Sequence, residues 1–346
     1  MRTSLLWLLA LGVAIPTWAQ PSQQIAEWQS KAGPAVMEVG IYQNGSLQWY
    51  SYYQDTVIEN QPTTQYFEIG SVTKPLMGMA MHHAFGDQPD LLDQPLADWL
   101  PDSLGWPKDP QQPITLRHLV THTTGLPRLP DNIRSTMKNF IDPFASYEEA
   151  ALLSFLKEWQ PDTVPGARFE YSNTGAGLLL YLMLNQLSTD YDAFTAQHLL
   201  SPLGLQEMGF SISDSLMIAP YQSNGYKSVL WHWTETMIGA GGMRATPQSM
   251  GQLVQLMASP TAELQSWLAK STAIQHESDI GPIATFWICP TLGEEPAFWH
   301  NGRTYGFETF LGIIPGQEKG LIILTNSTTG LPTSIGLQWL EALATP

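Results

Sequence analysis

Segments typical of β-strands stand at both ends of this chain, whereas segments typical of helices fill most of the sequence between them. Residues 35–53 alternate apolar and polar side chains around Asn44-Gly45, a pair that favours the type I′ turn of a β-hairpin. Two further β-rich runs, 307–315 and 320–326, are joined by a Pro-Gly turn signal. Because strands from the two ends must pair to bury their apolar faces, this pattern predicts a mostly antiparallel sheet with a helical insertion.

The helical insertion is expected from apolar residues that recur at helical spacing and from the Gly and Pro residues that punctuate them. With 346 residues, the chain is predicted to form one large domain, residues 20–346, with a helical lobe inserted at roughly 75–270. The predicted helices cover approximately residues 75–85, 115–122, 148–158, 175–187, 190–199, 248–258, 262–270 and 333–343.

Residues 1–19 have the features of an export signal. Arg2 supplies a positive charge, an apolar stretch too short to span a bilayer comfortably follows at 5–15, and Ala19 is a small residue suited to cleavage. We therefore predict an exported protein, periplasmic or secreted, with no stable membrane span after cleavage; an uncleaved anchor is the alternative. The single cysteine, Cys289, excludes an intramolecular disulfide and is expected to be buried and inert.

The charge balance is acidic, with 31 Asp and Glu residues against 15 Lys and Arg residues and a net charge of −16. This sign disfavours nucleic acid as a partner. A hydrophobic content of 43% and a charged content of 13% are typical of a globular protein rather than a disordered one.

Ser71 and Lys74 lie three residues apart in the segment FEIGSVTK at 67–74, where a helix is predicted to start. Residues at i and i+3 share a helical face, so the lysine amine can reach the serine hydroxyl. A neutral amine in that place could turn the hydroxyl into a nucleophile, and Ser-x-x-Lys is a signature of penicillin-recognising serine enzymes. The alternative is an ordinary helix start with a solvated lysine.

The triplet Tyr171-Ser172-Asn173 precedes a predicted helix and can present a phenol and an amide from a loop. A phenol close to Lys74 is expected to have its ionised form favoured by the opposite charge, which suits proton transfer to or from Ser71. The alternative is a helix cap beside a buried aromatic ring.

The segment WHNGRTYGF at 299–307 falls where an edge strand is expected. Gly302 permits the close approach of another backbone, and the N–H groups of the strand could bind an extended substrate as an added strand would. The alternatives are an ordinary hairpin turn and, for His300, a structural histidine.

The three motifs Ser-x-x-Lys, Tyr-x-Asn and His-x-Gly occur in this order at long spacings, each in the expected helix, loop or strand context. In this the chain resembles the class C β-lactamase and penicillin-binding serine hydrolase family. Three other segments look like those of the family: LRHLVTHTTGLP at 116–127, SPLGL at 201–205 and GAGGMRAT at 239–246. The resemblance extends from about residue 30 to about residue 330.

The resemblance implies an α/β fold of the α+β, β-lactamase/transpeptidase-like type. A five-stranded antiparallel sheet would carry the terminal helices, with a helical lobe beside it and a cleft between them. It also implies that Ser71 is the nucleophile, that Lys74 and Tyr171 share its proton, and that Asn173 orients them. Whether Lys74 or Tyr171 is the acylation base stays open, because strongly coupled groups titrate as a unit.

The strand that would bind the substrate is implied by the same resemblance. The backbone N–H groups of Ser71 and Arg303 would form an oxyanion hole, which stabilises charge that develops on the tetrahedral intermediate. His300, Asn301 and Gly302 would line the substrate-binding strand.

The chain departs from the family pattern at the substrate strand, where dedicated class C β-lactamases usually carry Lys-Thr-Gly and this chain has His300-Asn301-Gly302. Histidine is mostly neutral near pH 7 and does not supply the permanent charge that lysine offers to a substrate carboxylate. This departure disfavours efficient β-lactam turnover, and the side chain of Arg303 is a candidate replacement for the cation.

Two other positions depart from the family pattern. Leu129 stands where class C β-lactamases tend to have a glutamine that contacts the ligand, and Thr73 stands where Ser or Ala is more usual.

The predicted function is that of a serine hydrolase that forms an acyl-enzyme on an amide bond of a β-lactam or D-alanyl peptide and releases it to water. The expected partner is a small-molecule or short-peptide substrate, and no metal or organic cofactor is implied. A carboxylesterase with the same machinery and a catalytically weakened module that binds cell-wall peptide are the alternatives. His118 and His122 have a helical spacing, but Leu119 replaces the glutamate of a zinc protease, so structural roles are expected for both.

Overall fold

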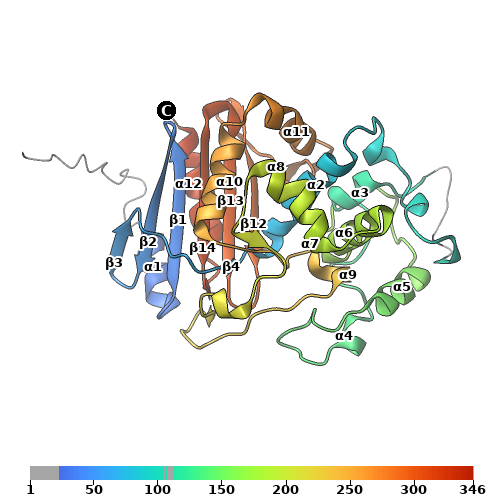
Figure 1. Cartoon of the computed structure of the whole chain (residues 1–346), viewed down its shortest axis with the longest axis horizontal. Helices are drawn as coiled ribbons and strands as arrows, with labels where there is room; N and C mark the ends of the chain where they lie inside the picture. Colours follow the sequence, from blue (N-terminus) through green and yellow to red (C-terminus); the bar gives the residue numbers. More distant parts are fainter. Residues whose placement is uncertain (1–22, 105, 107–111, 346) are drawn as a thin grey trace, which may run out of the picture.

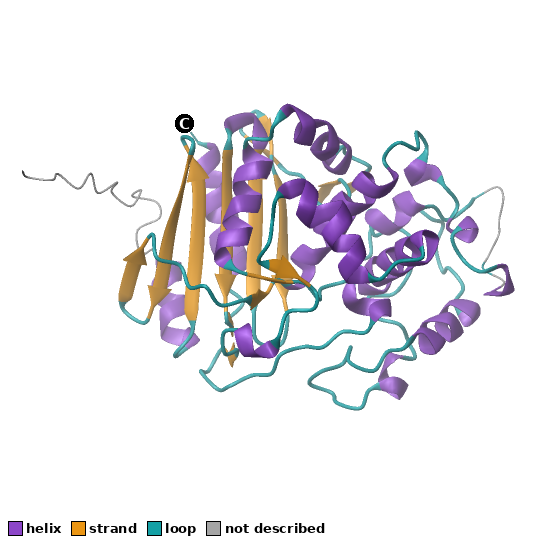
Figure 2. Cartoon of the chain, viewed as in Figure 1, coloured by secondary structure: helices purple, strands orange, loops and turns teal. Residues whose placement is uncertain are grey.

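The main element of the fold is a six-stranded sheet, seen in a computed structural model that describes residues 23–104, 106 and 112–345 (Figures 1 and 2). The predicted export signal at residues 1–19 lies outside the described residues. The strand order is β12-β13-β14-β1-β2-β3, and neighbouring strands are antiparallel throughout. The central pairing of β14 with β1 joins the two ends of the chain, as predicted from the β-rich termini.

The strands fall close to the predicted ranges, but the sheet has six strands rather than the predicted five. The hairpin at Asn44-Gly45 is present, and both turn residues have the positive φ angles, 53° and 72°, of a type I′ turn. The additional strand, β3, pairs with β2 through a second tight turn at Gln54. It has only four residues and no Gly or Pro turn signal precedes it, which explains why the sequence pattern did not predict it. The strands of this sheet are β1 (Val36–Gln43), β2 (Ser46–Tyr53), β3 (Thr56–Glu59), β12 (Phe298–Arg303), β13 (Glu308–Ile314) and β14 (Lys319–Thr325).

Helices cover both faces of the sheet. On one face, α1 (Gln23–Ala32) and α12 (Pro332–Ala344) bury Trp28 and Trp339 against apolar side chains of the central strands. On the other face lies α10 (Pro247–Ala258), which contacts β1 and β14 and falls in the range predicted for the helical lobe (Figure 1). The two terminal helices therefore belong to the sheet layer, as the family resemblance implied.

The helical lobe lies beside the β12 edge of the sheet and shares one continuous apolar core with α10 and the sheet face beneath it. Its central helices are α2 and α6, whose residues are buried almost throughout and which α3, α9 and α11 contact. The helices of this part are α2 (Thr73–Phe85), α3 (Leu116–Val120), α4 (Ile133–Thr136), α5 (Glu149–Glu158), α6 (Asn173–Leu187), α7 (Tyr191–Thr195), α8 (Ser201–Leu203), α9 (Glu235–Ile238) and α11 (Ala262–Thr272).

Each predicted helix has a counterpart in the structure, with ends that differ by a few residues. The segment predicted as a helix at 190–199 is divided between α7 and a π-helical turn, Ala196–Leu200. The short strands outside the main sheet are β4 (Phe67–Glu68), β5 (Met208–Gly209), β6 (Tyr221–Gln222), β7 (Arg244–Ala245), β8 (His276–Ser278), β9 (Gly281–Ile283), β10 (Thr291–Leu292), β11 (Glu295–Pro296) and β15 (Ser327–Thr328).

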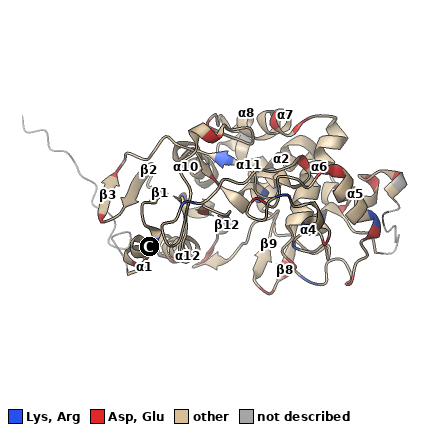
Figure 3. Ribbon diagram, turned by 90° about the horizontal axis from the view of Figure 1, so that it is seen from below, with Lys and Arg blue, Asp and Glu red and all other residues tan. Residues whose placement is uncertain are grey.

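Charged residues are spread over both parts of the molecule, and acidic positions outnumber basic ones (Figure 3). Cys289 is buried as predicted, and burial raises the pKa of its thiol to about 12, which makes it unreactive at neutral pH. None of the helices in the described part of the chain is long and apolar enough to cross a membrane.

Candidate active site

Ser71 lies in a 3₁₀ turn, Gly70–Val72, that joins the short strand β4 to helix α2. Gly70 has a φ of +52°, a conformation that glycine adopts without strain, and the turn redirects the chain from the strand into the helix. Ser71 itself is partly exposed, whereas its neighbours Gly70 and Val72 are buried. The turn therefore presents the hydroxyl to solvent on a rigid support.

The Lys74 amine reaches back to this hydroxyl from the first turn of α2. Its Nζ atom lies 2.9 Å from Ser71 Oγ and donates a hydrogen bond of 2.5 Å to the backbone carbonyl of Ala240. The side chain of Lys74 is fully buried. The predicted contact between the serine and the lysine is therefore present, and the solvated lysine of the alternative is not.

Burial favours the neutral form of the Lys74 amine. Desolvation lowers the pKa of Lys74 well below its ordinary value, and the positive charge of Arg128 lowers it further. An uncharged amine that donates one hydrogen to Ala240 keeps a lone pair that can accept the Ser71 proton. This arrangement suits general-base activation of the serine.

The loop that carries Tyr171 is fixed by hydrogen bonds to the segment that follows α3. The Ser172 hydroxyl accepts a hydrogen bond from the Gly175 N–H and so caps α6. It also donates a hydrogen bond of 2.9 Å to the carbonyl of Pro127.

Backbone N–H groups of the same loop make two further contacts with this segment. The Ser172 N–H donates to His122 Nδ1 at 3.2 Å, and the Asn173 N–H donates to the carbonyl of Arg128 at 3.0 Å. Two segments about fifty residues apart in sequence are thereby docked beside Ser71.

Tyr171 lies against Lys74, as predicted, but its phenol is not ionised. Lys74 Nζ lies 4.9 Å from the centre of the Tyr171 ring. Burial raises the pKa of Tyr171 to about 12, although the Ser71 hydroxyl and the Arg128 charge both act to lower it. The expectation that a lysine charge favours the phenolate was wrong, because desolvation of the phenol dominates.

Asn173 is the first residue of α6, and its Oδ1 atom is buried without a hydrogen-bond partner among the described residues. A buried amide oxygen is rarely left unpaired. This atom is thus available to accept a hydrogen bond.

Strand β12 passes in direct contact with the turn that carries Ser71. A Cβ atom added to Gly302 would lie 2.0 Å from the carbonyl oxygen of Ile69 and 3.1 Å from Ser71 N, and one added to Gly70 would lie 2.7 Å from Arg303 N. Glycine at both positions is required for this approach. This close approach of β12 to the turn brings the backbone nitrogens of Ser71 and Arg303 near each other.

The backbone of β12 also presents hydrogen-bonding groups on the side away from β13. Trp299 exchanges both of its backbone hydrogen bonds with Ile288, on the side of the strand away from β13. Because backbone groups alternate along a strand, Asn301 and Arg303 present their N–H and C=O groups to the same side. The Arg303 N–H therefore points toward the Ser71 turn.

The side chains of the His-x-Gly motif lie on two different sides of β12. His300 is buried toward the helical lobe, with its ring centre 6.2 Å from that of Tyr171, and its Nδ1 atom donates to the Asn301 carbonyl at 2.6 Å. Burial lowers the pKa of His300 to about 3, so the ring is neutral. The Asn301 side chain instead donates to Thr333 at the start of α12, away from Ser71. Only the backbone of Asn301 is in a position to line the site.

Two residues near the site were not singled out as functional from the sequence. Arg128 is exposed, and its guanidinium carbon lies 5.1 Å from the centre of the Tyr171 ring. His122 is buried with its ring centre 4.6 Å from that of Tyr171, and desolvation holds its pKa well below its ordinary value. Both lie in or next to the segment 116–127, but a single arginine or histidine in a loop carries no pattern that marks it.

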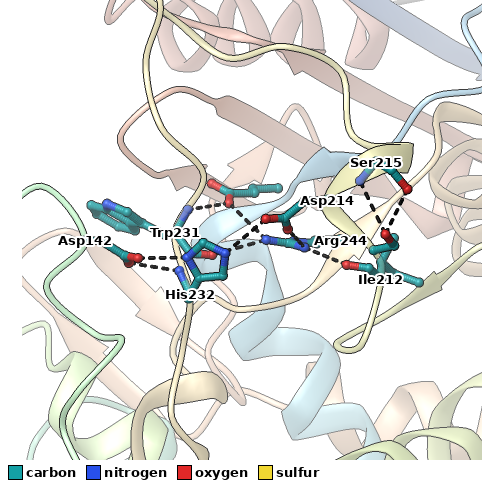
Figure 4. A network of polar contacts seen from close by, with 9 residues as sticks. Asp142, Ile212, Asp214, Ser215, Trp231, His232 and Arg244 are labelled. Carbon is teal, nitrogen blue, oxygen red and sulfur yellow. Dashed lines mark hydrogen bonds and ion pairs between the residues drawn. The ribbon is translucent and has the colours of Figure 1, made fainter.

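A network of charged side chains supports the strand that precedes Ser71 (Figure 4). Arg244 of β7 forms ion pairs with Asp214 at 2.7 Å and with the buried Glu68 of β4 at 3.8 Å. His232 bridges Asp214 and Asp142 at 3.1 and 2.8 Å, and burial raises the pKa of Glu68 to about 7. The network ties β4 to three loops around the site, and the sequence motifs did not predict it.

The same loops place aromatic rings beside the site. The backbone N–H of Trp231 donates to Glu68, and the Trp233 ring stacks on that of Phe144 with ring centres 4.1 Å apart. The Trp233 ring also packs on Gly241, next to the Ala240 carbonyl that binds Lys74. These rings form an apolar wall near the lysine. Among the described residues, no group of three or more His, Cys, Asp or Glu side chains could hold a metal ion.

Comparisons with known proteins find similar sequences over most of the chain. A sequence model of the Beta-lactamase family matches residues 26–345. A Beta-lactamase from Yersinia enterocolitica is 25% identical over 88% of this chain and 85% of the relative. The D-alanyl-D-alanine-carboxypeptidase/endopeptidase AmpH from Escherichia coli K12 is 25% identical over 75% of this chain and 70% of the relative.

A solved structure has the same fold. The Beta-lactamase/D-alanine carboxypeptidase from Yersinia pestis, complexed with citrate, superposes with a TM-score of 0.74 and covers 95% of this chain and 99% of its own, at 19% identity. The predicted fold class is therefore confirmed.

Proposed function

The chain belongs to the Beta-lactamase family and is a serine hydrolase, and we propose that Ser71 is its nucleophile and that its substrates are β-lactams or D-alanyl peptides. The observation that carries the assignment of the nucleophile is the 2.9 Å contact between the hydroxyl of the partly exposed Ser71 and the amine of the fully buried Lys74, whose pKa burial lowers. We further propose that the protein is exported through the signal at residues 1–19 and that residues 20–346 act as one domain.

Acylation begins with the transfer of the Ser71 proton to Lys74. The serine oxygen forms a bond to the carbonyl carbon of the substrate, and the amine, held by the Ala240 carbonyl, becomes a cation. A lowered pKa favours the neutral amine that can accept this proton, whereas an ordinary lysine already carries it at neutral pH. Lys74 is thereby favoured over Tyr171 as the acylation base.

The negative charge of the tetrahedral intermediate falls on the former carbonyl oxygen. The N–H groups of Ser71 and Arg303 would stabilise it, since the contact between Gly302 and the Ser71 turn brings the two nitrogens together. Both donors belong to a rigid backbone, so they require no reorganisation when the charge develops.

Breakdown of the intermediate requires a proton on the leaving nitrogen. Tyr171 is a neutral phenol, with its pKa raised to about 12 by burial, and can donate that proton while it receives one from Lys74. Asn173, with its unpaired Oδ1, would orient the amine that shuttles the proton. Water then attacks the acyl-enzyme and the same groups act in reverse order.

The substrate class rests on the relatives, which include proteins named as β-lactamase and as D-alanyl-D-alanine carboxypeptidase. One observation favours an ester hydrolase as a second candidate. The family's usual lysine on the substrate strand is replaced here by His300, which is buried and neutral and offers no charge to a substrate carboxylate.

Turnover of a chromogenic cephalosporin, a D-alanyl-D-alanine peptide and a short-chain aryl ester, measured side by side, tests the substrate class. We expect release of product from at least one of the two amide substrates at a kcat/KM above that for the ester after correction for the intrinsic reactivity of each bond. Turnover of the ester alone would contradict the proposed amide substrates and support the ester hydrolase.

A further inference from the structure

Arg128 is a cation next to the proposed catalytic residues. Its guanidinium carbon lies 5.1 Å from the centre of the Tyr171 ring, and Lys74 Nζ lies 4.9 Å from the same point. The side chain is exposed, and no carboxylate of the described residues forms an ion pair with it. In a chain with a net charge of −16, an arginine without an acidic partner at this place is available to an anionic ligand.

The backbone of Arg128 is held rigidly. Its carbonyl accepts a hydrogen bond from Asn173 N–H at 3.0 Å, and Pro127 and Pro130 restrict the chain on both sides. The carbonyl of Pro127 in turn accepts a hydrogen bond from the Ser172 hydroxyl, which belongs to the loop that carries Tyr171. The guanidinium is therefore carried by the same docked segments that position Tyr171.

The other basic groups near Ser71 are poorer candidates for binding an anion. Lys74 and His300 are both buried, and burial lowers the pKa of each. Arg303, the replacement suggested by the sequence, lies 3.6 Å from Glu308, whose carboxylate also accepts two contacts from the Gly330 N–H. The nearby carboxylate reduces the positive potential that a substrate would meet at Arg303.

We propose that Arg128 binds a carboxylate on the leaving-group side of the substrate and so replaces the cation that the substrate strand lacks. The position follows from Tyr171, which is proposed to protonate the leaving nitrogen: a carboxylate one carbon away from that nitrogen would lie beside the Tyr171 ring, where the guanidinium is. β-Lactams and D-alanyl peptides both carry a carboxylate at that distance from the scissile bond. Arg128 is thus a specificity-determining residue, an inference that rests on the proposed function of Ser71 and Tyr171.

The experiment compares a chromogenic cephalosporin as the free acid with its methyl ester. We expect the wild-type protein to prefer the acid, and Arg128→Gln to lower the ratio of kcat/KM for acid over ester by about tenfold to hundredfold, mainly through a higher KM for the acid. Arg128→Lys should retain part of the preference, because it keeps the charge but loses the planar pair of donors. Arg134→Gln, which removes an exposed arginine of α4, is the matched control and should retain the wild-type ratio.

The outcome also separates the two candidate cations. A wild-type ratio in Arg128→Gln would overturn the inference, and a fall in Arg303→Gln instead would assign the carboxylate to Arg303. If the wild-type protein consumes neither compound and Ser71 is not acylated by them, the proposed function fails rather than the role of Arg128.

Discussion

Replacement of Lys74 by methionine is expected to lower kcat/KM by about 10²–10⁴-fold, the range for loss of a positioned general base. Methionine is similar in length and fits a buried site, but it has no lone pair of comparable basicity to accept the Ser71 proton. Because the Lys74 side chain is fully buried, methionine is expected to fill its place rather than leave space for a water molecule there. Steady-state kinetics on whichever substrate the wild-type protein consumes most rapidly will measure the loss.

The matched control for this variant is Lys270→Met. Lys270 is an exposed lysine whose amine binds the Gly86 carbonyl on another part of the helical lobe, so activity should stay within about twofold. A thermal melt of both variants checks that the fold is retained. Lys74→Met with wild-type kcat/KM would contradict the assignment of the base.

The pH profile gives a second measurement of the same claim. The amine accepts a proton only while it is neutral, so the rate should fall as the pH drops through the lowered pKa of Lys74. This acid limb is expected well below the pKa range of an ordinary lysine. A rate that rises only near the ordinary range would indicate that Lys74 is charged at neutral pH.

Gly302→Ala is expected to lower kcat by about 10²–10³-fold, the loss found when one oxyanion-hole donor is displaced. The added methyl group would lie 2.0 Å from the carbonyl oxygen of Ile69, a backbone atom, so β12 must move away from the Ser71 turn. That movement separates the Arg303 N–H from Ser71. The same overpacking should cost about 1–3 kcal/mol of unfolding free energy, measured by chemical denaturation.

Gly209→Ala is the matched control, because a Cβ atom there would meet only the Ile212 side chain, at 3.9 Å. It should retain activity. If Gly302→Ala retained both activity and stability, the contact between β12 and the turn that carries Ser71 would not exist in solution.

The fold was predictable where the sequence pattern is local. The turn residues Asn44 and Gly45 define the first hairpin, and apolar periodicity located the long helices such as α2, α6 and α12 to within a few residues. The pairing of β1 with β14 followed from the need to bury strands at both ends of the chain. Strand β3 was missed because a four-residue strand after a turn at Gln54 has too little pattern to detect.

The site was predictable in part, because helix geometry brings Ser71 and Lys74 together from a spacing of three residues. The protonation of Tyr171 was not predictable, since it depends on how deeply two distant segments bury the phenol.

The contacts of two other side chains were not predictable either. The direction of the Asn301 side chain depends on which face of β12 meets the Ser71 turn. Arg128 becomes visible only when Asn173 and Pro127 dock its loop against Tyr171.

The network of ion pairs around Arg244 was also not predictable from the sequence. Glu68, Asp142, Asp214 and His232 are far apart in sequence, and no motif connects them. Their contacts arise from the way in which loops and short strands meet beside the sheet (Figure 4). Such contacts between residues far apart in sequence can be identified from the structure but not from the spacing of sequence motifs.

The central claim is that Ser71 forms a covalent acyl-enzyme, and intact-mass measurement tests it most directly. The protein is incubated with a penicillin and, separately, with a fluorophosphonate, and peptide mapping locates any adduct. We predict a mass increase equal to the attached group on Ser71 in the wild-type protein and none in Ser71→Ala. No adduct with either reagent, or the same adduct in Ser71→Ala, would contradict the account.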